Sequence, residues 1–273
     1  MIGLIQNEFM KIFSKKSSWI YMIILSVVVL GGAIIYYLLQ KNFPDMFSTT
    51  STSTWTFMNS VVYSLGSLVI LFSVIICSAN VSAEFGSGTI KQLLIRPHSR
   101  WKILLSKYVA VTLYSLLLMI TLFIIGYIIG LIFFGVGDFG AKIEEFGLNG
   151  TFEASVGTQV IQKFLLLIPG LLIVSTISFM LSTLFKSQAL AVGIGIFILF
   201  TSNSIGGVLF FLMEKFTWTK FLIFPHLDLS IYALQDTLAP GVTLGFSSVI
   251  LLAYYLIFMA ITFFFFQKRD ISF

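Results

Sequence analysis

The sequence predicts an all-α integral membrane protein, a single domain over residues 1–273 made of an N-terminal interfacial amphipathic helix and six transmembrane helices. The mean hydropathy is +1.03, 58% of the residues are apolar, and only 10% are charged. This composition is typical of membrane proteins. Six uncharged runs are each long enough to cross the hydrocarbon core of a bilayer.

The N-terminal segment, residues 1–17, predicts a helix that lies on the inner leaflet. Lys11, Lys15 and Lys16 supply its positive charge, and apolar residues recur between them at roughly helical spacing. The apolar run that follows is longer than the apolar core of a signal peptide and has no A-x-A cleavage pattern. We therefore interpret it as the first, uncleaved span.

The spans follow from the uncharged runs, and one of them carries a packing motif. Gly126 and Gly130 form a G-x-x-x-G pair, a spacing that lets helices approach closely in a membrane. Pairs of this kind also occur by chance in glycine-containing spans. The six predicted spans are residues 19–39, 56–79, 109–136, 164–185, 189–213 and 242–266.

The distribution of basic residues predicts the orientation of these spans. The side that holds both termini carries 11 Lys and Arg residues, and the other side carries 5. By the positive-inside rule, both termini are predicted to be cytoplasmic. Because the basic residues follow the alternation of a membrane topology, the net charge of +5 does not indicate a nucleic-acid partner.

The loops predicted to lie outside are short, and none could form a soluble domain of its own. Residues 41–55 are rich in Ser and Thr and are expected to be irregular. Residues 137–162 are acidic and show no persistent periodicity. Residues 214–241 contain several aromatic side chains, so we expect an interfacial helix held by these aromatics at the outer surface.

The loop between the second and third predicted spans, residues 84–100, has the most informative chemistry. Gly86 and Gly88 interrupt the helix that precedes them, and Thr89 stands three residues before Gln92 at the spacing of a capping box. Pro97 then disfavours helical geometry at the residue before it. The pattern predicts a helix of about two turns, too short to be stable alone in water. Either it lies on anionic lipid head groups or it docks in a groove of a partner protein.

This loop resembles the first cytoplasmic loop of type-2 ABC exporter permeases, which reads roughly E-x-G-T-x-K-x-L-L-x-x-P-x-x-R. In that family the loop forms the coupling helix that contacts the ATPase. The chain departs from the pattern by carrying Phe85-Gly86-Ser87 between the Glu and the Gly-Thr. By resemblance, the residues that contact the ATPase are Glu84, Gly88, Thr89, Ile90, Lys91, Leu93, Leu94, Arg96, Pro97 and Arg100.

The resemblance covers nearly the whole chain and implies a function. Two permease copies, or this chain and a paralogue, would pair in the bacterial plasma membrane and bind a separate ABC ATPase in two copies. The stretch at residues 224–229 is similar to the equivalent loop of bacitracin- and lantibiotic-immunity permeases. The implied cargo is therefore an amphipathic or hydrophobic peptide antibiotic or drug. Sodium, other small drugs and lipids stay open as cargo.

The motifs of an enzyme are missing from the sequence. No G-x-x-x-x-G-K-[ST] occurs, so ATP and Mg²⁺ are expected on the partner ATPase, and no cofactor is expected in this chain. His98 and His226 fall on opposite predicted sides, which argues against a shared metal site. Residues 135–138 spell the G-x-G-D of intramembrane aspartyl proteases, but no second carboxylate lies within a predicted span.

The predicted spans contain no ionisable residue, whereas ion-coupled carriers usually keep such residues in the membrane. This favours an amphipathic or apolar cargo over a small ion, although backbone carbonyls also carry ions in some channels. The alternative function is a channel or secondary carrier that works without an ATPase. Glu84 is the charge that most needs a partner, because it lies near the C-terminal end of the second span, where the helix dipole disfavours an anion. Either Arg96, Arg100 or a basic residue of the ATPase compensates it, or it is solvated at the membrane surface.

Overall fold

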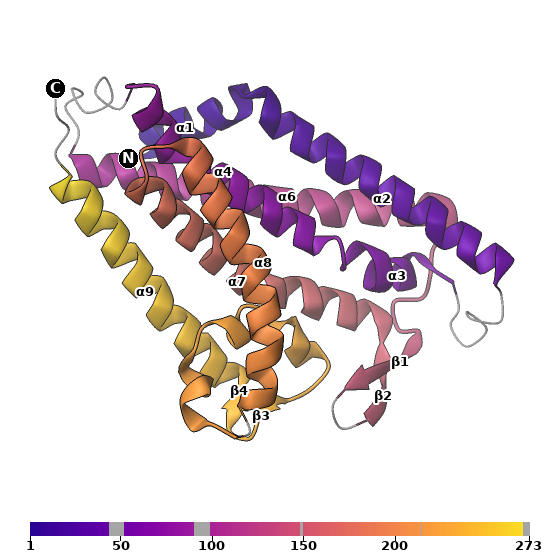
Figure 1. Cartoon of the computed structure of the whole chain (residues 1–273). Helices are drawn as coiled ribbons and strands as arrows, with labels where there is room; N and C mark the ends of the chain where they lie inside the picture. Colours follow the sequence, from indigo (N-terminus) through magenta and orange to yellow (C-terminus); the bar gives the residue numbers. More distant parts are fainter. Residues whose placement is uncertain (44–51, 90–98, 148–149, 214, 270–273) are drawn as a thin grey trace.

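The structure, a computed structural model, describes residues 1–43, 52–89, 99–147, 150–213 and 215–269. It confirms the predicted fold class, an all-α multi-pass membrane protein (Figure 1). Among the described residues, six helices are long and apolar enough to cross a membrane. They are α2 (Lys16–Asn42), α4 (Gly66–Gly86), α6 (Arg100–Phe134), α7 (Val156–Leu184), α8 (Gln188–Leu212) and α9 (Leu244–Lys268).

The two ends of the helix bundle differ in what covers them (Figure 1). At one end, here called the α1 end, lie the N-terminal helix α1 (Ile2–Ser14) and the C-terminal end of α9. Two arginines join the helices there: Arg100 of α6 donates to the Gln267 and Arg269 carbonyls at 3.3 Å, and Arg269 donates to the Thr183 carbonyl of α7. The opposite end, the hairpin end, carries two short β-hairpins.

Two of the six helices begin well before the predicted spans. The third predicted span starts at residue 109, whereas α6 starts at Arg100 and has 35 residues. The fourth starts at residue 164, whereas α7 starts at Val156. At 1.5 Å per residue, α6 is longer than the bilayer core is thick, roughly 30 Å. These helices begin before their apolar runs begin, because the backbone hydrogen bonds of a helix also form in polar sequence.

The second predicted span is broken near its start. A single turn, α3 (Thr54–Phe57), runs into a π-helical turn, η2 (Met58–Val62), and α4 begins only at Gly66 after a further turn. Ser53 begins the segment with a capping box, exchanging hydrogen bonds with Thr56. The prediction of one continuous helix over residues 56–79 is therefore wrong in its first part.

The G-x-x-x-G pair of α6 is where the broken segment packs. A Cβ atom added at Gly126 would lie 2.6 Å from a methyl carbon of Val62, and one added at Gly130 would lie 2.9 Å from the Thr54 methyl carbon. Larger side chains at either glycine would push α6 away from this segment. The close packing that the motif predicts is confirmed.

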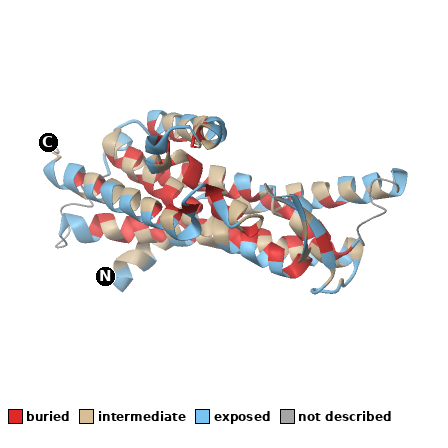
Figure 2. Cartoon of the chain, turned by 90° about the horizontal axis from the view of Figure 1, so that it is seen from below, coloured by how far each residue is buried: buried red, intermediate tan, exposed pale blue. Residues whose placement is uncertain are grey.

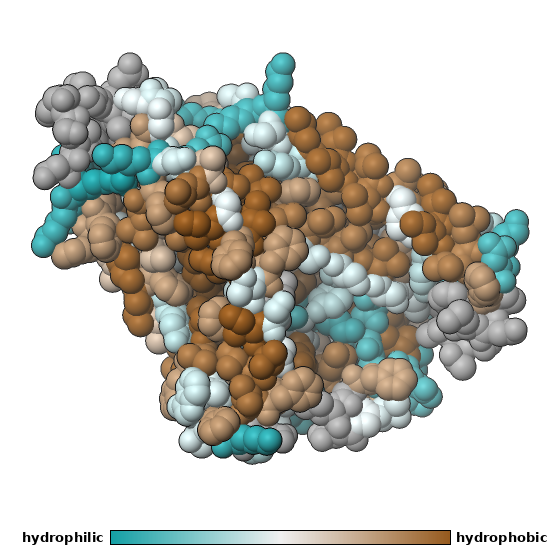
Figure 3. Space-filling view, viewed as in Figure 1, coloured by the Kyte–Doolittle hydropathy of each residue, from teal (hydrophilic) through white to brown (hydrophobic). Residues whose placement is uncertain are grey.

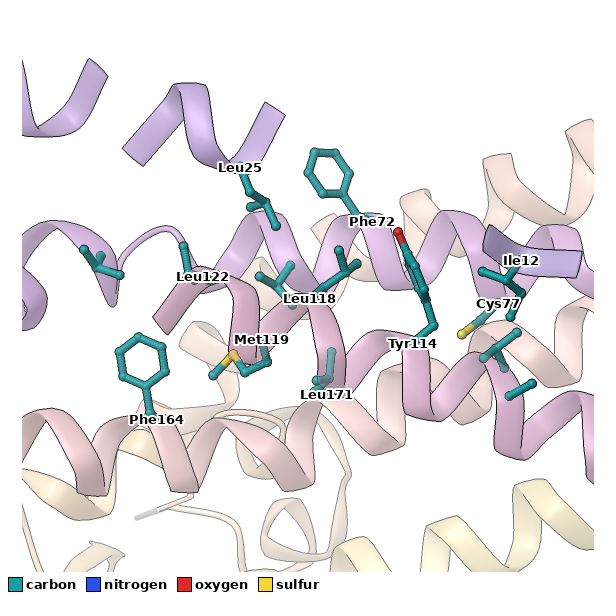
Figure 4. Close-up of a cluster of buried hydrophobic side chains, with 14 of the residues drawn as sticks. Ile12, Leu25, Phe72, Cys77, Tyr114, Leu118, Met119, Leu122, Phe164 and Leu171 are labelled. Carbon is teal, nitrogen blue, oxygen red and sulfur yellow. The ribbon is translucent and has the colours of Figure 1, made fainter. Parts of the chain in front are cut away.

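The core lies between α1, α2, α4, α6 and α7, where apolar side chains of these helices meet (Figure 4). Figure 2 shows buried residues concentrated along the central helices and exposed ones along the outer helices. α2 buries Leu25, Val29 and Ala33, spaced four residues apart, and exposes many of its other apolar residues. Figure 3 shows the result, a mainly hydrophobic face between polar residues at the two ends. Such an apolar outer surface suits contact with lipid.

The loops at the hairpin end have more regular structure than predicted. Within residues 137–162, β1 (Lys142–Gly147) and β2 (Gly150–Ser155) pair antiparallel, and residues 156–162 belong to the start of α7. Residues 44–51 lie outside the described part of the chain, and residues 52–55 contain the capped start of α3. The sequence signal for this hairpin is Gly147 together with the Asn-Gly pair at 149–150.

The predicted interfacial helix within residues 214–241 is wrong. The described part forms three 3₁₀ helices, η3 (Thr217–Phe221), η4 (Phe224–His226) and η5 (Leu229–Ala233), followed by the hairpin of β3 (Thr237–Ala239) and β4 (Val242–Thr243). Pro225 lacks an N–H and cannot continue a helix through its interior. The segment folds into short turns against α7, α8 and α9 instead.

His226 is fully buried in this segment, and burial lowers its pKa below the ordinary value, although a hydrogen bond to the Lys220 carbonyl acts in the opposite direction. Above about pH 6.5 the imidazole is neutral in both folded and unfolded chains. As the pH falls below this value, the unfolded chain takes up the proton first, so stability is lost until the folded pKa is passed. We expect the unfolding midpoint of the detergent-solubilised protein to fall between pH 7.5 and pH 5.5. The His226→Gln variant should show a smaller fall, and an equal fall would assign the effect to other groups.

Candidate functional site

The structure places four of the ten predicted coupling residues. Glu84 lies in the last turn of α4, Gly88 follows the end of that helix with a positive φ of 73°, Thr89 comes next, and Arg100 begins α6. α4 ends at Gly86, so the predicted interruption by the two glycines is confirmed. The remaining six predicted residues lie outside the described part of the chain: Ile90, Lys91, Leu93, Leu94, Arg96 and Pro97.

The partner of Glu84 differs from the one expected. Lys107 of α6 donates to Glu84 Oε1 at 2.6 Å, two helical turns beyond the start of α6. Arg100 is engaged elsewhere, with the carbonyls at the end of α9, and Arg96 is not described. The expectation that Arg100 compensates Glu84 is therefore wrong, because the helix carries Arg100 toward α9 and Lys107 toward α4.

Lys107 also holds a second carboxylate, and together these residues form a four-membered charged cluster. Its ammonium group donates to Glu8 Oε2 of α1 at 2.7 Å. Lys11 lies 2.7 Å from Glu8 Oε1 and 3.5 Å from Glu84 Oε1. Two positive and two negative charges thus join α1, α4 and α6 near the C-terminal end of α4, which precedes the predicted coupling loop in the sequence. We call Glu8, Lys11, Glu84 and Lys107 the inner cluster.

Lys107 and Glu8 are the deeply buried members of the inner cluster, whereas the Lys11 side chain is 40% exposed and that of Glu84 is 17% exposed. The Lys107 side chain is 1% exposed and that of Glu8 is 6% exposed. Burial alone would raise the pKa of the Glu8 carboxyl, but the charges and hydrogen bonds of Lys107 and Lys11 outweigh it and lower this pKa. A buried charge that loses its partner is very costly, because water cannot replace the lost contact. The cluster therefore fixes the positions of three helices relative to one another.

A second group of ionised residues lies at the hairpin end. Lys163 of α7 lies 2.8 Å from Glu145 of β1 and donates to Asn59 Oδ1 of η2 at 2.9 Å. Asn59 in turn donates to Glu145 Oε1 at 2.7 Å. These contacts join the broken second span, the hairpin and α7. We call Asn59, Glu145 and Lys163 the outer cluster.

Both clusters correct the expectation that the spans contain no ionisable residue. Lys107 lies in α6, two residues before the third predicted span. Lys163 lies in α7, one residue before the fourth predicted span. A signal was present in the sequence: Lys107 shares a helical face with Leu104 and Val111, and Glu8 interrupts the apolar face of α1. Ionisable residues at such positions indicate buried pairs.

The carboxylate of the protease-like G-x-G-D stretch accepts a hydrogen bond within a turn. Asp138 is exposed at the hairpin end, and its Oδ1 accepts a hydrogen bond from the Gly140 N–H at 2.9 Å. This contact closes the turn that leads into β1. Within the described ranges, no three His, Cys, Asp or Glu residues are grouped in a way that could hold a metal ion.

The sequence of the chain matches a known family over most of its length. The profile of the family described as "Protein of unknown function (DUF2705)" matches residues 19–272. The chain belongs to this family. The matched region of this DUF2705 chain begins three residues into α2 and contains the other five spanning helices in full.

Two curated proteins of Bacillus subtilis (strain 168) are similar to the chain over its whole length. "Uncharacterized protein YhcI" is 32% identical over 320 aligned positions, which cover 100% of both chains. "Uncharacterized membrane protein YdbK" is 28% identical over 263 positions, which cover 96% of this chain and 99% of the relative. The printed name of the second relative agrees with the six apolar helices. The chain is a multi-pass membrane protein.

Proposed function

We propose that the chain is the transmembrane permease subunit of an ATP-driven ABC exporter, coupled through residues 84–100 to a separate ATPase. The observation that carries the proposal is the position of the inner cluster. The loop with the motif of a coupling helix joins α4 to α6, and at its base Lys107 ties both helices to α1. A force applied to such a loop would reach three helices at once.

The packing of α4 supports transmission of movement from this loop into the membrane. α4 packs against α6, α7 and α8. Near the α1 end, the N–H groups of Val81 and Ser82 both lie 2.9 Å from the hydroxyl oxygen of Ser182 in α7. Closure of two ATPases below two paired permeases would therefore shift α4 and α7 together and move cargo outward.

The remaining parts of the proposal rest on charge and resemblance. The α1 end faces the cytoplasm, where 11 of the 16 Lys and Arg residues would lie. ATP and Mg²⁺ bind to the ATPase partner. The second permease is another copy of this chain or a paralogue, and the cargo is amphipathic or hydrophobic.

A second candidate function, an ATPase-independent channel or carrier, is favoured by the two buried lysines. Ionisable residues inside membrane-spanning helices often mark ion pathways. However, Lys107 and Lys163 are each held by carboxylates at 2.6–2.8 Å, and the two clusters lie at opposite ends of the bundle. Paired charges at the helix ends stabilise the fold without providing a relay between the two sides. The exporter is the better supported function.

Recovery of an ATPase with the tagged chain tests the proposal. Purification from the native cell in mild detergent is expected to recover a protein with a Walker motif. Leu93 and Leu94 share the apolar face of the predicted coupling helix, so changing both to Asp should reduce this recovery at least about tenfold, since the charges would have to be buried without partners. Mass spectrometry of the purified sample provides the measurement.

The matched control adds the same two charges elsewhere in the loop. Gln92 and His98 lie off the predicted apolar face, and changing both to Asp should leave the recovery unchanged. If no ATPase is recovered even after crosslinking in cells, the exporter assignment fails and the self-sufficient carrier takes its place. Equal recovery with both double variants would reject the contact at Leu93 and Leu94.

A further inference from the structure

A cavity of about 360 Å³ opens among α4, α7, α8 and the 3₁₀ segment that contains Asp228. Tyr63, Ser64, Ser67, Ser202 and Asp228 line its polar part, and the rest of the lining is apolar, mainly leucines of α4, α7 and α8. Pockets that bind small molecules are mostly apolar, with a few polar groups that fix orientation, and have volumes of about 300–1,000 Å³. This cavity has that character and lies at the lower end of that range.

The break in the second span lies on this cavity. Tyr63 and Ser64 belong to the turn between η2 and α4, and Ser67 follows in the first turn of α4. The Tyr63 hydroxyl is hydrogen-bonded to the Ser230 hydroxyl, which also donates to Asp228. The broken helix is thus joined to the 3₁₀ segment at the cavity wall. Helices broken by π-turns or unwound backbone frequently line binding sites in membrane proteins.

Asp228 gives the polar part of the cavity a negative charge. The residue is exposed, and among the described residues it forms no ion pair. Ser230 donates only to its Oδ1 atom, from the backbone N–H at 3.0 Å and from the hydroxyl. The second carboxylate oxygen is left for a ligand.

The neighbouring positive charge is already neutralised. Lys163 lies 5.6 Å from the centre of the Tyr63 ring, and its ammonium is bound by Glu145 and Asn59 of the outer cluster. Two of the first N–H groups of α4 are occupied, because that of Gly66 donates to the Tyr63 carbonyl at 2.9 Å and that of Leu68 donates to the Leu65 carbonyl at 3.0 Å. The net charge that a ligand meets is therefore that of Asp228.

We propose that this cavity binds an amphipathic organic cation as cargo. Asp228 holds the positive group, and the apolar body lies between α4, α7 and α8. A second cavity of about 270 Å³ shares Ser202, Leu227 and Asp228 with the first and extends the space toward β3. This inference rests on the proposed export function and names the class of its cargo.

Two ions of the same shape and opposite charge test the inference. Binding of tetraphenylphosphonium and of tetraphenylborate to the detergent-solubilised full-length protein is measured by equilibrium dialysis without nucleotide. The cation is expected to bind saturably and the anion is not. Asp228→Asn should weaken cation binding about fivefold, as expected for an exposed ion pair. Asn retains an oxygen that can accept from the Ser230 N–H, so the local turn is kept.

Two further variants make the result decisive. Asp236→Asn removes an exposed acid of the same segment that does not line the cavity, and it should leave binding unchanged. Leu71→Trp fills the apolar part and should abolish cation binding while Asp228 stays in place. Equal binding of both ions, no saturable binding, or no effect of Asp228→Asn would each overturn the inference. Because the assay needs no ATPase, its failure leaves the recovery of an ATPase intact as a separate result.

Discussion

Replacing Lys107 by Met is expected to destabilise the protein strongly, because it removes the partner that two carboxylates share. The Lys107 side chain is 1% exposed and binds Glu8 and Glu84 at 2.7 and 2.6 Å. Met fills similar space but leaves two buried carboxylates with Lys11 alone. Losing one partner of a buried ion pair costs about 3–5 kcal/mol. For a chain of this size, the unfolding midpoint should fall on the order of 10 °C, measured by tryptophan fluorescence in mild detergent.

A control and a rescue separate the ion pair from general damage to α6. Lys102 is exposed on the same helix, so Lys102→Met should leave the midpoint within about 2 °C of the unchanged protein. Adding Glu8→Gln and Glu84→Gln to Lys107→Met removes the uncompensated charges and should restore part of the loss. If Lys107→Met unfolds at the original temperature, the inner cluster does not hold the three helices together.

Changing Gly170 to Ala is expected to disturb both stability and the cavity beside Asp228. A Cβ atom at this position of α7 would lie 2.0 Å from the carbonyl oxygen of Leu227. The obstacle is backbone, so no side-chain rotation can relieve the clash, and the segment holding Leu227 and Asp228 must move. Overpacking of this kind costs about 1–3 kcal/mol. We expect a lower unfolding midpoint and at least about fivefold weaker binding of tetraphenylphosphonium, the loss expected when Asp228 moves away from the cation.

Gly31→Ala is the matched control for this change. Gly31 lies in α2, and a Cβ atom there would meet nothing within 4 Å. Ala is a better helix former than Gly by up to about 1 kcal/mol, so the midpoint should stay the same or rise slightly, with binding unchanged. A Gly170→Ala protein that keeps both its midpoint and its affinity would contradict the close approach of α7 to Leu227.

The limits of the sequence prediction follow from particular residues. Hydropathy identified six spans because each run is long and uncharged, but it set the start of α6 and α7 too late, at the first apolar residue after a lysine. Lys107 and Lys163 belong inside the helices because polar and charged partners from other elements surround them. Glu8 is 99 residues from Lys107 and Asn59 is 104 residues from Lys163, whereas the carboxylates of Glu84 and Glu145 are 23 and 18 residues away. No local window contains all the partners of either lysine.

At the candidate site, the partner of Glu84 was also decided by the packing of helices. Glu84 and the motif around it were found from the sequence, whereas the assignment of Arg100 as its partner failed. Several basic residues could pair with Glu84, and the orientation of α6 about its axis decides which one does. That orientation is set by packing contacts such as that of Gly126 with Val62 of η2. Glu8 was missed because the helical spacing of residues 1–17 was applied to the apolar residues alone, and the acid that lies between them was not considered.

The sequence by itself determined the membrane class, the number of spans, the glycines that end α4 and the loop motif of residues 84–100. These properties depend on the transfer free energy and backbone preference of residues that are neighbours along the chain. The tertiary structure decided the break at η2, the two buried clusters and the cavity at Asp228. Each of these joins at least three elements that are distant in sequence, and a buried charge or a cavity wall is defined only when those elements pack.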